Sequence, residues 1–436
     1  MGDIVCKFGG SSMADAAQIR KVIDIIRADP RRRFIVVSAP GRRSESDQKI
    51  TDLLYACHDR VSRGENPSEP LQRVRERYLQ LGGELGVGRM IAELWEEVEA
   101  RIRAGASKDY AASRGEYLCA RLLAEHLQVG FLDTEGLIQI EDNGKVHESS
   151  YPRLEAALRE RPMWVIPGFY GSGPDGQVRT FSRGGSDITG AVVARAVGAE
   201  IYENWTDVSG FLMADPRVVD SPRSMREVSY REMRELAAMG AQVLHEDAIY
   251  PAAQAGIPIH IRNTNDPGHP GTRVVRSRSG AAGEVVGIAG KKGFVAVRVC
   301  KERIHRLAAL MQDLYEAFQE CGVEPMLSAS GIDAAVIVAA ESQIGGKKEV
   351  LRQSIERRLH PERIELREQL ALVSVVGEGM AGCPGVASRL FSALARERIN
   401  VLLLEGGSSG ASLTVGVEER EAAASIRALY RACAAS

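Results

Sequence analysis

Short apolar runs alternate with amphipathic stretches over the first half of the chain, the pattern of strands followed by helices. Four apolar runs predict strands, at residues 4–6, 34–37, 163–166 and 199–205. Helical spacing follows them, for example in the apolar positions between Ile19 and Ile26. This alternation is typical of an open, mostly parallel sheet whose strands are joined by helices.

Three further segments are assigned from the same periodicity. The charged stretch at residues 67–106 has helical spacing, and we interpret it as an external helical pair without chemistry. Another helix is expected to open at Ser113, which places Glu116 in its first turn. A helix, a turn with His245 and a β-like run close the first domain at residues 233–261; we interpret His245 as a surface residue.

Glycines gather after the predicted strand at residues 163–166, where they let the backbone approach a ligand. They stand at positions 168, 171, 173 and 176. The sequence SRGGSD then predicts a helix over residues 188–197, with Ser186 as N-cap and Gly198 as its C-terminal stop. Arg183 and Asp187 therefore flank a helix N-terminus, where free N–H groups favour anions.

Lys7 ends the first apolar strand directly before a Gly9-Gly10 turn and a helix. A strand, a glycine turn and a helix present backbone N–H groups to phosphate. The lysine precedes the glycines, so this is not a Walker A loop.

Residues suited to binding follow the predicted strands at their carboxyl ends. They are Lys7, Ser38, Gly168 and Asp207. In open parallel sheets ligands collect at that edge, so we expect these residues to line one site.

The chain changes character beyond residue 285. Pro/Gly/Ser-rich linkers are predicted at residues 263–272 and 277–283. The segment that follows then repeats itself at an offset of roughly 78 residues, each unit reading as strand, helix, strand, loop, strand and helix. A duplicated α+β module outside the predicted site indicates a regulatory or dimerising role.

Composition narrows the class of partner. A chain of 436 residues is expected to form two or three domains. The net charge of −2 argues against nucleic acid or a membrane as the main partner. Seven single cysteines, with neither a signal segment nor an apolar run of membrane-spanning length, favour the cytoplasm.

The candidate residues together suit phosphoryl transfer to an amino acid. A glycine turn with Lys7 and a helix-terminal Asp187 imply a nucleoside triphosphate. Glu116 suits an ammonium group and Arg183 an α-carboxylate. A carboxylate acceptor is already ionised at pH 7 and needs no general base, so the task is to position two anions and neutralise their charge with Lys7, Mg²⁺ and N–H groups.

The ordered motifs resemble those of the aspartokinases over nearly the whole chain. They are KFGGSS, VVSAPG, SRGE, GFYGSGPDG, SRGGSD and TDVSGFLMADPR, and the duplicated tail resembles a pair of ACT modules. The resemblance implies the three-layer αβα amino-acid-kinase fold. It also implies transfer of the ATP γ-phosphate to the β-carboxylate of L-aspartate, the entry to lysine, threonine and methionine synthesis.

Site roles follow from the resemblance residue by residue. Lys7 would neutralise the transferring group, and Asp187 would orient Lys7 rather than act as a base. The remaining ATP contacts would be Gly9, Gly10, Ser11, Thr206, Asp207 and Arg217. The aspartate site would be lined by Ser38, Thr51, Glu116, Phe169, Arg183 and Ser186.

Three positions depart from the family pattern. Leu212 stands where many members have a tyrosine that contacts the nucleotide, and Gln242 replaces a lysine. Glu405 lies in a loop that is longer and Gln-containing in relatives of this type.

The resemblance also implies domains, partners and alternatives. The expected domains are a kinase domain at 1–275 and ACT modules at 285–365 and 366–436. Lysine, threonine or both are the expected effectors, near Ser328, Ser330 and Asp333, with dimerisation or higher assembly through the tail. Two alternatives remain: a kinase for another acidic amino acid such as glutamate, and an amino-acid sensor with a silent kinase domain.

Overall fold

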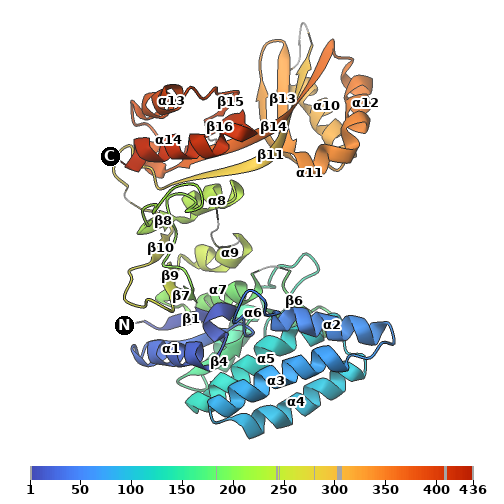
Figure 1. Cartoon of the computed structure of the whole chain (residues 1–436), viewed down its shortest axis with the longest axis vertical. Helices are drawn as coiled ribbons and strands as arrows, with labels where there is room; N and C mark the ends of the chain where they lie inside the picture. The colour runs from blue at the N-terminus through green and yellow to red at the C-terminus, as the bar shows by residue number, and fades with distance from the viewer. Residues whose placement is uncertain are drawn as a thin grey trace. The chain divides into compact units, whose positions relative to one another are not determined.

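The computed structural model describes residues 2–182, 184–241, 244, 246–278, 280–301, 307–406 and 410–434. They form two compact units (Figure 1). The first comprises residues 1–211, 224–230 and 243–278, and the second comprises residues 212–223, 231–242 and 279–436. No described helix combines the length and the apolar character that a membrane crossing requires.

The first unit is built on an eight-stranded sheet in the order β3-β4-β2-β1-β7-β9-β10-β8. Its strands are β1 (Ile4–Phe8), β2 (Arg32–Val37), β3 (Gly130–Phe131), β4 (Trp164–Pro167), β7 (Ile201–Thr206), β8 (Glu227–Ser229), β9 (Ile259–Asn263) and β10 (Thr272–Val275). All neighbouring pairs are parallel except β9 and β10. Beside this sheet, β5 (Tyr170–Ser172) and β6 (Val178–Thr180) form a hairpin.

Helices cover both faces of this sheet. One face carries α1 (Ala16–Arg27), α2 (Ile50–Ser62), α3 (Ser68–Glu84), α4 (Gly88–Arg103) and α5 (Lys108–Leu127), and the other carries α6 (Ser150–Leu158), α7 (Gly185–Val197) and α9 (Glu246–Ala255). Because side chains alternate along a strand, Cys6 and Ile35 enter the core shared with α1 to α5, whereas Lys7 points toward α7. The three αβα layers confirm the predicted fold class.

Two helix starts differ from the prediction. The helix with Glu116 begins at Lys108, where Ser107 accepts a hydrogen bond from the Tyr110 N–H, so Glu116 lies in the interior of α5. Similarly, α7 begins at Gly185 with Gly184 as N-cap, and Ser186 makes no capping bond. Gly184 adopts a left-handed conformation (φ 59°) that glycine reaches without strain. The helix therefore begins earlier in the chain than predicted. Gly198 ends α7 as predicted.

Two other segments lie deeper in the fold than the sequence indicated. Residues 67–106 do form a helical pair, α3 and α4, but Tyr78 and Trp95 are fully buried in the core, so the pair is not merely external. Residues 263–272 are not a linker: they form the turn between β9 and β10, where Thr264 hydrogen-bonds Ser12 at 2.7 Å.

The second unit contains an antiparallel six-stranded sheet in the order β12-β13-β11-β14-β16-β15. Its first half comprises β11 (Gly287–Cys300), α10 (Leu307–Glu320), β12 (Pro325–Ser330), β13 (Ala334–Ala340) and α12 (Lys348–Leu359). Its second half comprises β14 (Arg363–Val376), α13 (Val386–Arg396), β15 (Leu403–Glu405), β16 (Ser412–Glu418) and α14 (Ala422–Ala434). The predicted repeat of strand, helix, two strands and helix is therefore present.

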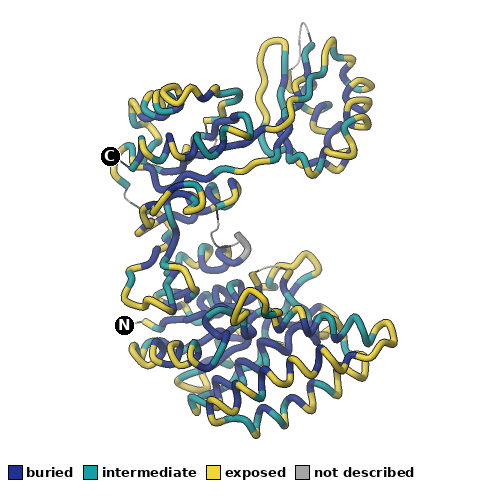
Figure 2. Tube along the Cα trace, viewed as in Figure 1, coloured by how far each residue is buried: buried dark blue, intermediate teal, exposed yellow. Residues whose placement is uncertain are grey.

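Both long strands bend at the same level. Gly293 in β11 and Gln369 in β14 have positive φ values of 81° and 55°, and the strand register shifts between Lys292 and Phe294. On the C-terminal side of each strand's own bend, residues 294–300 of β11 pair with β13, and residues 370–376 of β14 pair with β16. Figure 2 shows buried stretches along these strands and exposed outer sides on the helices.

Part of the middle of the chain belongs to the second unit. In α8 (Tyr230–Ala238), Glu232 accepts a hydrogen bond from the Glu378 N–H at 2.8 Å, and Glu235 accepts one from Ser412 Oγ at 2.9 Å. The Met213 carbonyl accepts a bond from the Ile288 N–H at 2.7 Å. These contacts place the short segments 212–223 and 231–241 with the C-terminal sheet.

Candidate active site

Lys7 and Asp187 form an ion pair at the carboxyl end of β1. Lys7 Nζ lies 2.5 Å from Asp187 Oδ1, and both side chains are largely buried. Asn204 Nδ2 donates to the same oxygen at 2.8 Å, while the Tyr202 hydroxyl donates to the Asp187 backbone carbonyl at 3.1 Å. Asn204 of β7 therefore holds the Asp187 carboxylate in place, and that carboxylate in turn holds the Lys7 ammonium group.

The glycine turn after β1 is held from two sides. The Gly9 N–H donates to the Trp205 carbonyl at 3.0 Å, and the Gly41 N–H donates to the Gly10 carbonyl at 2.8 Å. A Cβ atom on Gly41 would lie 2.6 Å from that carbonyl oxygen, so no larger residue fits there without movement. Ser11 follows in a short 3₁₀ helix (Gly10–Met13). The turn therefore stands beside Lys7 with its backbone fixed.

The loop after β4 lies against the first turn of α7. A Cβ atom on Gly168 would lie 2.6 Å from Ser186 Oγ, and one on Gly185 would lie 2.6 Å from the Phe169 ring. Phe169 has φ 79°, unusual for a residue with a side chain, and its N–H donates to Thr189 Oγ1 at 3.1 Å. The two glycine-rich segments thus form one packed surface, and strain at Phe169 marks it as a candidate site.

Glu116 is a buried carboxyl group on α5 beside the loop after β2. Only 5% of the residue is exposed, and burial raises the pKa of its carboxyl to about 7 despite a hydrogen bond from the Ala39 N–H. Its Oε2 has no hydrogen-bond partner among the described residues. A buried acceptor without a donor is costly, so this oxygen suits a cationic or N–H-bearing ligand.

The other predicted site residues of the first unit lie at or near the same edge. Ser38 follows β2, where its N–H donates to the Phe8 carbonyl at 3.1 Å. Thr206 ends β7 and donates to Asp207 Oδ1 at 3.1 Å. Thr51 lies in the first turn of α2, next to Ile50, which packs beside Gly115 of α5. The structure therefore brings together loops that are distant in the sequence.

Other named positions do not fall in the described part of the first unit. Arg217 belongs to the second unit, where it is exposed and held by Asp215 through contacts of 3.0 Å and 2.6 Å. Leu212 is grouped with the same unit. Arg183, Gln242 and His245 lie outside the described residues.

Sequence reasoning missed the residues that support the pair and the loops. They are Tyr202, Asn204, Thr189 and Arg77. Two adjacent polar residues, Glu203 and Asn204, inside an apolar strand were the one available signal for Asn204. Arg77 gave none, because it is one of several arginines on a charged helix.

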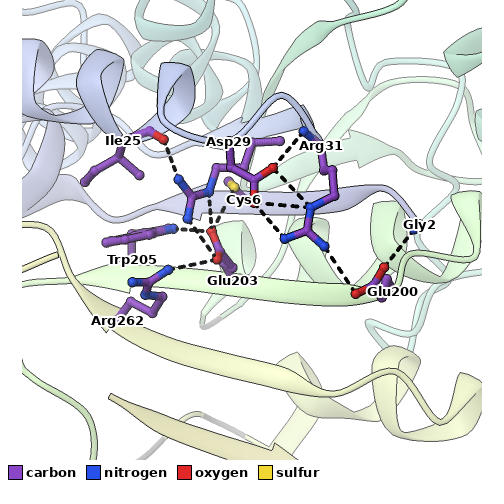
Figure 3. A network of polar contacts seen from close by, with 10 residues as sticks. Gly2, Cys6, Ile25, Asp29, Arg31, Glu200, Glu203, Trp205 and Arg262 are labelled. Carbon is purple, nitrogen blue, oxygen red and sulfur yellow. Dashed lines mark hydrogen bonds and ion pairs between the residues drawn. The ribbon is translucent and has the colours of Figure 1, made fainter. Parts of the chain in front are cut away.

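A second buried charge cluster lies on the opposite face of β1 and β7. Glu203 accepts bonds from Arg32 at 2.8 and 3.1 Å, Arg262 at 3.1 Å, Trp205 at 2.9 Å and Cys6 at 3.3 Å (Figure 3). Burial alone would raise the pKa of Glu203, but the hydrogen bonds and charge of Arg32 hold it below the usual value. Arg262 therefore already has an anionic partner, Glu203, within this cluster.

No group of three or more His, Cys, Asp or Glu residues suited to a metal occurs among the described residues.

Comparison with known proteins identifies the family. A model of the amino acid kinase family matches residues 4–263, and an ACT domain model matches residues 373–433. Aspartokinase 3 of Bacillus subtilis is 37% identical, with 98% of each chain covered. The crystal structure of Clostridium acetobutylicum aspartate kinase is 41% identical with a TM-score of 0.94, covering 98% of this chain and 99% of that one.

A more distant structure carries ligands. Escherichia coli aspartokinase III in complex with aspartate and ADP is 25% identical with a TM-score of 0.74, and 99% of each chain is covered. The fold, the site and these matches define an ATP-dependent kinase of the amino acid kinase class with a C-terminal ACT domain. Within that class, the chain belongs to the aspartokinase family.

Proposed function

We propose that this kinase transfers the γ-phosphate of ATP to the β-carboxylate of L-aspartate, giving 4-phospho-L-aspartate on the route to lysine, threonine and methionine. The observation that carries the proposal is the Lys7–Asp187 contact of 2.5 Å beside the Gly9-Gly10 turn. A cation fixed at this position would offset the repulsion between two anionic reactants, which supports the proposal. The relatives named above, one of them bound to aspartate and ADP, support the substrate.

Each residue then has a defined task. Lys7 neutralises the transferring phosphoryl group, and Asp187, already bound by Asn204 and Lys7, orients the lysine. No base is needed, because the acceptor carboxylate is ionised at neutral pH. Mg²⁺ carried by the ATP phosphates supplies further charge neutralisation. Gly9, Gly10, Ser11, Thr206, Asp207 and Arg217 are proposed as the remaining nucleotide contacts.

Glu116 is proposed to bind the ammonium group of aspartate through its unpartnered oxygen. Arg183 is assigned the α-carboxylate from the sequence motif alone. Ser38, Thr51, Phe169 and Ser186 complete the proposed pocket.

The second unit is proposed to be regulatory. We divide the chain into a kinase domain at 1–275 and ACT modules at 285–365 and 366–436, which share the sheet through β11 and β14. Lysine, threonine or both are the proposed effectors. Ser328, Ser330 and Asp333 mark the region of this unit where we propose that they bind.

Assembly and location also remain proposals. We propose a homodimer or a higher homo-oligomer formed through the ACT modules. Cytoplasmic residence is supported by seven free cysteines.

The test is aspartate-dependent, ATP-dependent hydroxamate formation in hydroxylamine. Lys7→Ala is expected to abolish it without unfolding the protein, as checked by circular dichroism. Lys21→Ala is the matched control, because Lys21 is exposed on α1 and donates a hydrogen bond to Asn265, away from the glycine turn. Activity that survives in Lys7→Ala, or a preference for glutamate over aspartate, would refute the assignment.

A further inference from the structure

Arg77 is a buried arginine on α3, a helix for which the sequence predicted no chemistry. Only 6% of the residue is exposed. Its Nη2 donates to the Ala14 carbonyl at 2.5 Å and to the Gly41 carbonyl at 2.9 Å, and its Nη1 donates to Asp47 Oδ2 at 2.9 Å. One guanidinium therefore joins two loops to α3, the one that precedes α1 and the one between β2 and α2.

Two of these partners flank the glycine turn beside Lys7. Ala14 is the C-cap of the 3₁₀ helix that contains Ser11, and the Gly41 N–H donates to the Gly10 carbonyl. Gly41 and Gly10 are packed so closely that displacement of Gly41 must displace the turn. Arg77 therefore fixes the turn from behind without lying in it.

The third partner, Asp47, lies in the charged loop between Ser38 and Thr51. Its side chain also accepts from Arg43 Nε at 3.0 Å. Hydrogen bonds from Arg43, opposed by partial burial and reinforced by Arg77, hold the pKa of Asp47 well below its usual range. The carboxylate is therefore charged at neutral pH and ties this loop to α3.

We propose that Arg77 is a positioning residue that aligns the phosphate-binding turn with the loop joining Ser38 to Thr51. This rests on the proposed function for the identity of the acceptor. The planar guanidinium reaches three acceptors on two sides at once, which the single ammonium of lysine does not reproduce. The segment around α3 thus takes part in catalysis through the geometry of both substrate sites.

The experiment compares Arg77→Gln and Arg77→Lys with the matched control Arg75→Gln. Arg75 lies on the same helix, α3, but its side chain is exposed. We expect Arg77→Gln to weaken Mg·ADP binding in calorimetry about tenfold and to raise the KM of both substrates similarly. Arg77→Lys should recover part of the loss, whereas Arg75→Gln should stay within about twofold of wild type.

A folded Arg77→Gln protein with unchanged ADP affinity and KM values would overturn the proposal. If that variant does not fold, Asp47→Asn decides, because it weakens the bonds that Asp47 accepts from Arg77 and Arg43 and leaves those from Arg77 to Ala14 and Gly41 in place. It should raise the KM for aspartate while leaving ADP affinity unchanged, and an unchanged KM would overturn the proposal. ADP binding requires no acceptor, so a wild type that binds ADP but ignores aspartate would refute the proposed function alone.

Discussion

Two buried carboxylates of the kinase unit, Glu203 and Glu116, have opposite hydrogen-bonding environments. Glu203 receives donors from four side chains, among them Arg32 and Arg262, and its pKa is held below the usual value. Glu116 keeps one oxygen without a hydrogen-bond partner among the described residues, and burial raises its pKa to about 7. The first arrangement satisfies a charge within the fold, while the second is the one that we propose a ligand completes. Saturation of hydrogen bonds, rather than burial, is therefore the property that separates the structural charge from the one proposed to bind substrate.

The largest expected effect is on the saturated cluster. Glu203→Gln should lower the free energy of unfolding by about 3 to 5 kcal/mol, because Arg32 and Arg262 would keep buried charges without their anion. Urea denaturation measures this loss. Glu200→Gln is the control, since the exposed Glu200–Arg31 pair should contribute little. Equal stability of the two variants would remove the distinction between the clusters.

The same substitution at the unsaturated site should behave differently. Glu116→Gln should raise the KM for aspartate about 10- to 100-fold, because the ammonium loses its anionic partner. The midpoint of urea denaturation near pH 8 should stay equal or rise, since a poorly satisfied buried charge is removed. A large loss of stability would show that Glu116 is structural after all.

The raised pKa of Glu116 predicts two opposite pH dependences. Its folded pKa of about 7 lies above the ordinary 4.5, so the stability it contributes is complete below about 4.5 and is lost as pH rises through about 7. Aspartate binding requires the ionised form. The KM for aspartate should therefore rise by up to about tenfold per pH unit below 7. Initial rates between about pH 6 and 8 test this, and Glu116→Gln should flatten the profile.

A smaller effect is expected behind the ion pair. Asn204→Ala removes the 2.8 Å hydrogen bond to Asp187, so kcat should fall about tenfold as Lys7 loses its alignment. Tyr202→Phe removes only a bond to the Asp187 backbone carbonyl and should change kcat less. Steady-state kinetics of the two variants measure the difference. Identical values would show that Asn204 does not act through Asp187.

The sequence predicted the parts of this site that depend on local pattern. Lys7, Ser38, Gly168 and Asp207 stand at strand ends, and apolar periodicity alone locates strand ends. Helix starts were harder to predict, because Ser186 resembles an N-cap while the left-handed Gly184, two residues earlier, takes that role. The proposal that Glu116 binds the ammonium group rests on residue type and motif, and its burial inside α5 beside the Ala39 N–H depends on packing that the sequence does not show.

Contacts between residues distant in sequence explain the rest. Arg77 reaches Gly41 and Ala14 across the fold, and nothing in the sequence pairs this arginine with either residue. Asn204 meets Asp187 only because β7 and α7 pack together. Such partners are fixed by tertiary packing, which a one-dimensional pattern does not encode.

The two strands β11 and β14 have a consequence for how the C-terminal unit can be divided. Residues 363–367 of β14 supply an edge of the first half, and residues 287–292 of β11 supply an edge of the second. A cut between the halves would leave each with an unpaired strand edge, the usual template for aggregation. We therefore expect the two halves to fold and unfold together, and excised fragments that end near residue 360 to aggregate.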